Sequence, residues 1–166
     1  MEAKAQKFTL KLVKEETSQY KLDYKVNNPE VAYRAFIDIL ELDCQAEEVF
    51  GILTLDIKSK ITGVFEVSRG SISKSVVSPR EVFKRAILNN ACGIILGHNH
   101  PSGELTPSSE DKSITEKLKK AGDLIGITIL DHLIIGDNNY ISLRERGYLS
   151  WSVISAAIIS GLKILI

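Results

Sequence analysis

The alternation of hydrophobic and polar residues along this chain has two periods, which indicates both strands and helices. Apolar residues at every second position in 8–12 and 20–26 flank a polar turn and predict a β-hairpin or two edge strands. Apolar runs bounded by turn residues predict further strands at 47–56, 61–68, 91–97, 126–136 and 140–142. The first two of these are joined by a four-residue turn at 57–60, so we expect them to pair antiparallel.

Segments in which apolar residues have helical spacing lie between these strands. Two of the predicted helices begin at clear N-caps. Asn28 precedes Pro29 and starts a helix whose apolar face runs to Leu40. Ser78 precedes a second proline, and Glu81 stands three residues after Ser78, as in a capping box. This second helix is expected to end at Asn89 and Asn90.

A third helix is predicted over 109–121, with Ser108 as its N-cap and Gly122 as its end. Helices and strands therefore follow one another along most of the chain. That order predicts an α/β protein with a mixed β-sheet between helices.

Composition narrows the class of protein further. The 166 residues suffice for one domain with a real core, and 21 basic residues balance 21 acidic ones. A dedicated nucleic-acid binder usually carries a basic excess, so the net charge argues against that class and leaves only a local basic face. Cys44 and Cys92 lie in apolar contexts and are expected to be reduced core thiols. With no apolar signal-peptide core at the N-terminus, a cytoplasmic protein is expected.

The segment 149–166 is apolar on nearly every face. A membrane-spanning helix needs about 20 apolar residues. This segment is shorter and includes serines, Gly161 and Lys163, so we expect a buried helix or one that forms a homo-oligomer. A tail that associates with a membrane is the alternative.

The stretch from Gly97 to Asp111 carries the candidate chemistry. His98 and His100 stand one residue apart at the end of an apolar strand, where alternate side chains point the same way. Asp111 falls in the first turn of the following helix, and the loop can fold it back towards both histidines. Two imidazoles and one carboxylate form a common ligand set for catalytic zinc, with a fourth position for water. The pattern therefore predicts a metal site.

Structural interpretations compete with this one at several residues. Asp111 alone fits the capping box that begins at Ser108, where a carboxylate favours the helix dipole. Asp131 and His132 form either a structural pair at a strand end or bring a third histidine to the site. Arg80, in the first turn of its helix, pairs with a carboxylate or binds an anion. For Asp111 taken alone capping is favoured, and for Asp131 and His132 the structural pair is favoured. For Arg80 the sequence does not choose between the alternatives.

The spacing His-x-His, seven residues, Ser, two residues and Asp resembles the JAMM signature of JAB/MPN metalloproteases. His98, His100, Ser108 and Asp111 match its positions. The strings SPRE, HNHPSG and LDHLIIG, at 78–81, 98–103 and 130–136, resemble the bacterial RadC group in particular. The resemblance covers 45–148, with 1–44 as an N-terminal extension and 149–166 as a tail. It implies a JAB/MPN fold related to cytidine deaminase and one Zn²⁺ per chain, with His98, His100 and Asp111 as ligands.

The same family uses an upstream glutamate in a Glu-x-x-Gly context as general acid and base. Glu48 precedes Gly51 in that pattern, whereas Glu47 should point away by strand alternation. Without the motif, Glu48 would be taken for a solvated carboxylate at a strand end. The resemblance implies that Ser108 hydrogen-bonds the developing oxyanion or the metal-bound water. It also implies a zinc metallopeptidase that hydrolyses peptide or isopeptide bonds in a polypeptide substrate.

A second function follows from the historical association of the RadC group with DNA repair. Longer members carry an N-terminal helix-hairpin-helix segment of DNA-binding type. The N-terminus here lacks the Gly-rich hairpin of such a segment, and the neutral net charge agrees. The alternative is thus a DNA-repair-associated accessory or DNA-binding module whose metal site is structural or vestigial.

Overall fold

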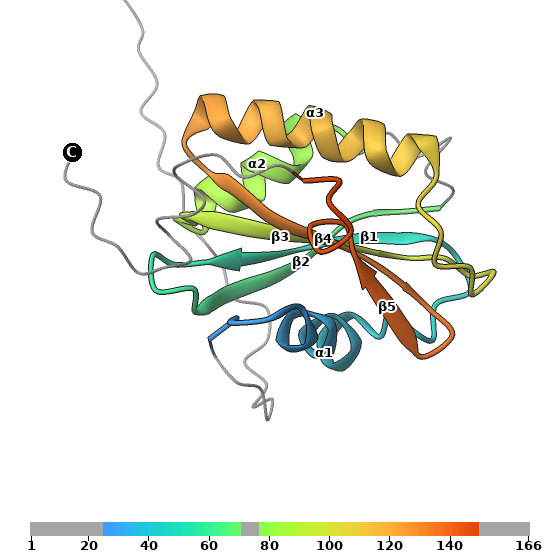
Figure 1. Cartoon of the computed structure of the whole chain (residues 1–166). Coiled ribbons are helices and arrows are strands. Elements are labelled where there is room, and N and C mark those ends of the chain that lie inside the picture. Colours follow the sequence, from blue (N-terminus) through green and yellow to red (C-terminus); the bar gives the residue numbers. More distant parts are fainter. Residues whose placement is uncertain (1–24, 71–76, 150–166) are drawn as a thin grey trace, which may run out of the picture.

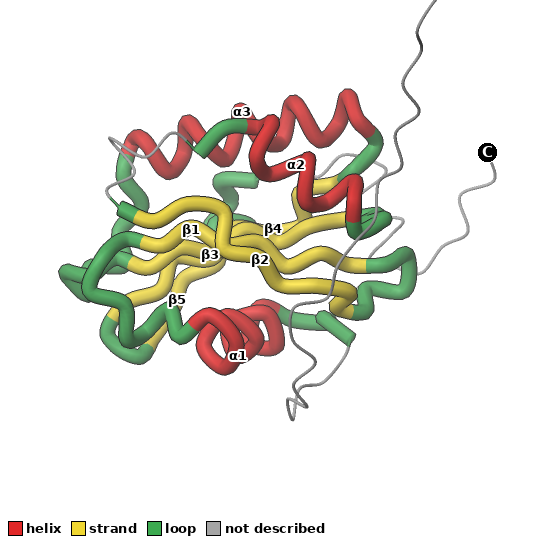
Figure 2. The backbone as a smooth tube through the Cα atoms, turned by 180° about the vertical axis from the view of Figure 1, so that it is seen from behind, coloured by secondary structure: helices red, strands yellow, loops and turns green. Residues whose placement is uncertain are grey.

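A computed structural model of the protein describes residues 25–70 and 77–149, which form a mixed five-stranded sheet with helices on both faces (Figure 1). The strand order is β2-β1-β3-β4-β5, and only β3 and β4 run parallel among these neighbours. Helices α2 and α3 cover one face and α1 the other (Figure 2). The elements are α1 Pro29–Leu40, β1 Val49–Leu55, β2 Ile61–Arg69, α2 Pro79–Leu88, β3 Gly93–Asn99, α3 Ser109–Ile125, β4 Thr128–Gly136 and β5 Asn139–Ser142.

This arrangement confirms the predicted α/β fold with a mixed sheet between helices. The predicted antiparallel pair is β1 and β2. The strands expected over 8–26 lie outside the described residues up to 24, and at their end Lys25 forms an isolated antiparallel bridge with Lys60. The helix expected over 149–166 lies outside the described residues beyond Leu149. Within the described ranges, no helix is both long and apolar enough to cross a bilayer.

The helix starts agree with their predicted caps. Asn28 Oδ1 accepts a hydrogen bond from the Val31 amide at 3.1 Å, and Ser78 Oγ accepts one from the Glu81 amide at 3.4 Å. At the start of α3, Ser108 and Asp111 form a complete capping box. These side chains satisfy backbone N–H groups that have no partner within the first helical turn.

The predicted end of α3 at Gly122 is wrong, because the helix continues to Ile125 and is capped by Gly126 with φ 82°. Gly122 is buried inside the helix, where a Cβ atom would collide with the carbonyl oxygen of Ile127 and lie 3.2 Å from the Phe83 ring. Glycine is therefore present for close packing rather than for helix termination.

Strand β3 lies at the centre of the sheet and continues two residues beyond its predicted end at Gly97. Leu96 belongs to the core under α2 and α3, whereas Ile95 belongs to the core under α1. By the same alternation, His98 lies on the α3 side and Asn99 on the α1 side. Gly97 leaves room for Phe36 of α1, whose ring would lie 2.5 Å from an added Cβ.

A register shift in β4 changes the sides on which its polar residues lie. Ile94 pairs with Ile129, but Ile95 pairs with Asp131, so one extra residue stands in β4. Such an insertion turns the residues that follow it to the opposite faces of the sheet. The ring of His132 therefore lies on the α3 side, and the carboxylate of Asp131 on the α1 side.

The prediction of a structural pair between Asp131 and His132 is consequently wrong, because the two side chains lie on opposite faces of the sheet. The Asp131 carboxylate accepts hydrogen bonds from Ser142 Oγ at 2.6 Å and from the backbone amides of His132 and Arg144. Burial, partly offset by the hydrogen bond from Ser142, raises the pKa of Asp131. The alternative interpretation, a third histidine near the site, is the one that the contacts of His132 support.

Both cysteines are free, as expected. Cys44 is exposed and Cys92 is partly buried, so the prediction that both lie in the core is wrong for Cys44. Cys44 follows the end of α1, where the chain crosses the surface before it enters β1.

Candidate metal centre

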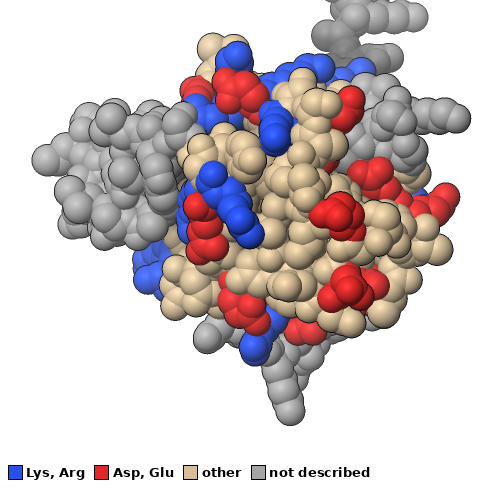
Figure 3. Space-filling view, turned by 45° about the vertical axis from the view of Figure 1, so that its right-hand side comes forward, with Lys and Arg blue, Asp and Glu red and all other residues tan. Residues whose placement is uncertain are grey.

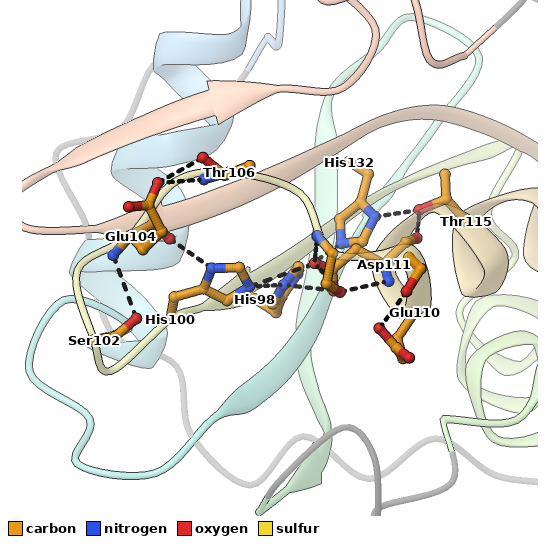
Figure 4. A network of polar contacts seen from close by, with 11 residues as sticks. His98, His100, Ser102, Glu104, Thr106, Glu110, Asp111, Thr115 and His132 are labelled. Carbon is orange, nitrogen blue, oxygen red and sulfur yellow. Dashed lines mark hydrogen bonds and ion pairs between the residues drawn. The ribbon is translucent and has the colours of Figure 1, made fainter.

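The candidate centre lies where β3 ends, α3 begins and the chain enters β1. Because β1 and β3 are antiparallel, the register that pairs Phe50 with His98 brings Glu48 level with His100. The loop after His100 returns the chain so that Asp111, in the first turn of α3, lies against both rings (Figure 4). Residues far apart in the sequence thus meet at one end of the sheet.

Four side chains converge there. One ligand atom from each of Glu48, His98, His100 and Asp111 lies within 4.8 Å of the others, and this group could hold a metal ion. Nε2 of His98 is 3.0 Å from Nε2 of His100 and 3.1 Å from Oδ1 of Asp111. In tetrahedral coordination with bonds of about 2.0–2.1 Å, neighbouring ligand atoms lie roughly 3.3 Å apart. The observed separations are close to that value.

The orientation of His100 is fixed by its own loop. Nδ1 of His100 donates a hydrogen bond to the carbonyl oxygen of Glu104 at 2.6 Å. The Glu104 carboxylate in turn accepts from the amide and hydroxyl of Thr106, which closes the loop on itself. Because a carbonyl can only accept, the neutral ring of His100 carries its proton on Nδ1 and a lone pair on Nε2.

Ser108 holds Asp111 through Oδ2, which also lies 3.5 Å from Nε2 of His100. Oδ2 of Asp111 accepts hydrogen bonds from the Ser108 amide at 2.8 Å and from Ser108 Oγ at 2.7 Å. Oδ1 of Asp111 faces His98. Burial raises the pKa of Asp111, but the neighbouring His100 and His98 rings and the hydrogen bonds from Ser108 outweigh burial and hold this pKa well below its usual range. The carboxylate is therefore ionised at neutral pH.

The donor set fits a divalent metal ion. The lone pair of His100 and the carboxylate of Asp111 face the same point as Nε2 of His98, and atoms of this kind repel unless a cation lies among them. Consistent with this demand for positive charge, the hydrogen bond that a protonated His100 would donate to Asp111 raises the pKa of His100, against the effect of burial. Imidazole nitrogen and carboxylate oxygen are both zinc ligands, so these three residues fit Zn²⁺.

Glu48 is brought to the cluster by Asn99, a residue that the sequence interpretation missed. The side chain of Asn99 accepts a hydrogen bond from the Val49 amide at 2.7 Å and donates to the carbonyls of Glu47 at 3.1 Å and Gln45 at 3.3 Å. These contacts fix the backbone on both sides of Glu48. Glu48 is half-buried whereas Glu47 is exposed, which agrees with the alternation expected for the strand entry.

Two further buried residues stand behind His98. Nδ1 of His98 lies 2.8 Å from Nε2 of His132, and Nδ1 of His132 lies 2.6 Å from Oγ1 of Thr115 (Figure 4). Burial, together with the nearby His98, lowers the pKa of His132 well below its ordinary value. Thr115 was not predicted, although it stands one helical turn after Asp111 and therefore on the same face of α3.

Two further residues singled out in the sequence, Ser108 and Arg80, remain to be placed. The Ser108 hydroxyl donates its only proton to Asp111, so contact with an oxyanion requires that proton to change partner. Its predicted role in catalysis stays a prediction. Arg80 is exposed in the first turn of α2.

The mixed sheet between helices and its histidine–aspartate cluster define an α/β domain of the JAB/MPN type. Residues 26–148 match the family described as RadC-like JAB domain, and this chain belongs to that family. The match begins at 26 and therefore includes α1, which the sequence interpretation had placed in an extension.

Curated relatives agree with this assignment. A UPF0758 protein of Desulfitobacterium hafniense is 47% identical over 125 residues, which cover 75% of this chain and 54% of that protein. The UPF0758 protein TTE0897 of Caldanaerobacter subterraneus is 45% identical over 126 residues, 76% of this chain and 53% of that protein. A UPF0758 protein of Pelobacter propionicus is 51% identical over 107 residues, 64% of this chain and 46% of that protein. The chain spans about half the length of these relatives.

Proposed function

We propose that this protein is a zinc-dependent hydrolase of peptide or isopeptide bonds, of the RadC-like JAMM type. The observation that carries the proposal is the position of Glu48, whose carboxylate lies within 4.8 Å of the ligand atoms of His98, His100 and Asp111. A purely structural metal site has four protein ligands, and Glu48 is near enough to be the fourth. We assign Glu48 to proton transfer instead, because its Glu-x-x-Gly context resembles the position of the general acid and base in JAMM proteases. Three ligands with an adjacent, half-buried carboxylate fit a catalytic site better.

The chain's own residues then divide the chemistry among them. His98, His100 and Asp111 would hold the metal ion, which when bound would supply Lewis acidity and lower the pKa of a water molecule. Glu48 takes the proton from the attacking water and delivers it to the leaving amine. Ser108, once its hydroxyl turns from Asp111, donates to the oxygen on which negative charge develops.

Metal content and hydrolysis test this assignment together. We expect the wild-type protein to bind zinc at one equivalent, and His100→Ala and Asp111→Asn to lose that binding because each removes a ligand. Glu48→Gln should keep the zinc and lose hydrolysis of a peptide and isopeptide panel by a factor of about 100 or more, because the proton acceptor is gone. The measurements are zinc by elemental analysis and initial rates of cleavage.

Glu47→Gln is the matched control, because it makes the same change at the adjacent, exposed residue. It should leave both zinc content and rate unchanged. One full equivalent of zinc in His100→Ala and Asp111→Asn would show that the ligand assignment is wrong. Equal rates for Glu48→Gln and Glu47→Gln would contradict the role of Glu48.

The alternative, an accessory or DNA-binding module for DNA repair, has less support among the described residues. Basic and acidic side chains are interspersed on the face shown in Figure 3 rather than segregated into a basic surface. Salt-sensitive DNA binding that survives Glu48→Gln, with no cleavage of any peptide by zinc-loaded protein, would favour this alternative.

A further inference from the structure

A chain of buried hydrogen bonds links the backbone of Asp111 to the ring of His98. It runs from the carbonyl oxygen of Asp111 to Thr115 Oγ1 at 2.5 Å, to Nδ1 of His132 at 2.6 Å, and from Nε2 of His132 to Nδ1 of His98 at 2.8 Å. Thr115 is 2% exposed, and both histidines are 0% exposed. Water is therefore excluded, and each group must find its partner within the chain of contacts.

The Asp111 carbonyl, at one end of this series of hydrogen bonds, determines which atom donates in each of them. The Asp111 carbonyl can only accept, so the Thr115 hydroxyl donates its single proton to it. Thr115 Oγ1 must then accept from Nδ1 of His132. A neutral imidazole has one N–H group, so Nε2 of His132 carries a lone pair and accepts from Nδ1 of His98. The neutral ring of His98 is left with its lone pair on Nε2.

We propose that Thr115 and His132 are positioning residues that fix His98 in the tautomer able to bind a metal ion. Nε2 of His98 is the atom that lies 3.0 Å from His100 and 3.1 Å from Asp111. The opposite tautomer would direct an N–H group into that cluster and block coordination. This inference rests on the proposed metal site and adds to it the residues that prepare one of its ligands.

The arrangement differs from the usual support of a metal-binding histidine. Such a histidine commonly donates its second N–H group to a carboxylate, a backbone carbonyl or water. His98 instead donates to a neutral imidazole, which adds no charge to the site. The contacts also close a ring, because Asp111 provides a carbonyl at one end and a carboxylate oxygen beside His98 at the other. Two proposed ligands from α3 and β3 are thereby joined through β4.

Substitutions at Thr115 test the proposal without altering any proposed ligand. Thr115→Val has nearly the same shape but no hydroxyl, so Nδ1 of His132 loses its acceptor and the order of donors is no longer imposed. We expect the zinc affinity of Thr115→Val, measured by competition with a chromophoric chelator, to fall by about 10- to 100-fold. Thr115→Ser keeps the hydroxyl and should remain within about twofold of wild type.

Ring ¹⁵N spectra give a readout that a merely structural role would not change. The chain has three histidines, so all ring nitrogens can be followed. Wild-type protein, with or without zinc, should show His132 protonated on Nδ1 only and His98 protonated on Nδ1. Thr115→Ser should give the same pattern, and Thr115→Val should lose the Nδ1 proton signature of His132.

The outcomes separate this proposal from the metal site itself. A folded Thr115→Val protein with wild-type zinc affinity overturns it, and so does a wild-type spectrum in which His132 carries its proton on Nε2. The wild-type spectrum decides the point even if Thr115→Val does not fold. If wild-type protein binds no zinc while the predicted ring protonation is seen, the proposed function fails and the order of donors stands.

Discussion

Asn99 illustrates how a residue without catalytic chemistry can determine the geometry of a site. It stands between His98 and His100, but its side chain points to the opposite face of the sheet and binds the backbone around Glu48. Asn99 is 2% exposed, so water cannot replace it as the acceptor of the hydrogen bond from the Val49 amide. The position of the proposed base therefore depends on a side chain on the far side of β3.

Replacing Asn99 should loosen the strand entry. Asn99→Leu removes all three hydrogen bonds, and we expect a loss of roughly 1–3 kcal/mol in the free energy of unfolding, because a buried N–H group is left without a partner. Hydrogen exchange at the Val49 amide should become faster. Asn99→Asp keeps the oxygen that accepts from Val49 and should preserve most of that protection. Unchanged stability and unchanged exchange in Asn99→Leu would contradict this role.

The sequence identified the residues of the candidate cluster but not those that orient them. His98, His100, Asp111 and Glu48 could be chosen because their types and spacing match a known motif, and the structure brings all four together. The role of His132 depends on a one-residue register shift in β4, which strand alternation does not reveal. Support for His100 comes from a backbone carbonyl, which is the same for every residue type.

At the scale of elements, helix α3 shows where local sequence signals mislead. Its start follows from Ser108 and Asp111, because capping is a local interaction. Its end does not follow from Gly122, because the requirement for glycine there comes from the backbone of Ile127 and the ring of Phe83. Local signals predicted the order and type of the described elements, and contacts between elements decided the exceptions.

Gly122→Ala tests this reading of α3. Helix propensity alone would make the substitution stabilising by about 1 kcal/mol. We expect instead a loss of about 1–3 kcal/mol in the free energy of unfolding, because the added methyl group collides with backbone that cannot easily move. Denaturant titration measures the difference.

Ser113→Ala is the control in the same helix, at an exposed position. It should be neutral or stabilising by up to about 0.5 kcal/mol. If Gly122→Ala were as stable as Ser113→Ala, the glycine would have no packing role and the explanation of the helix end would fail.

At the scale of the whole molecule, the proposed metal ion joins segments that the sequence keeps apart. The strand entry at Glu48, the end of β3 and the start of α3 all contribute to the cluster. A ligand that binds only the folded state stabilises that state by mass action. Occupancy of the site should therefore be visible in the stability of the entire domain.

Removing the metal should lower the melting temperature. Zinc at 100 times its dissociation constant contributes about 2.7 kcal/mol, and each kcal/mol shifts the melting temperature by about 2–4 °C for a chain of this length. We expect a chelator to lower the wild-type melting temperature by several degrees and added zinc to restore it. His100→Ala should show no response to either treatment, and a chelator response equal to that of wild type would place the stabilising ion elsewhere.

The proposed ligand set of His98, His100 and Asp111 also bears on how the protein must be prepared. Sites built from imidazole and carboxylate generally bind divalent first-row metals in the Irving–Williams order, with copper and nickel high in the series. A cluster of this composition has little selectivity against nickel that leaches from an affinity column. An ion found after purification would therefore reflect the metals to which the protein was exposed. Purification without immobilised nickel, followed by loading with a defined metal, gives a sample whose activity can be assigned to that metal.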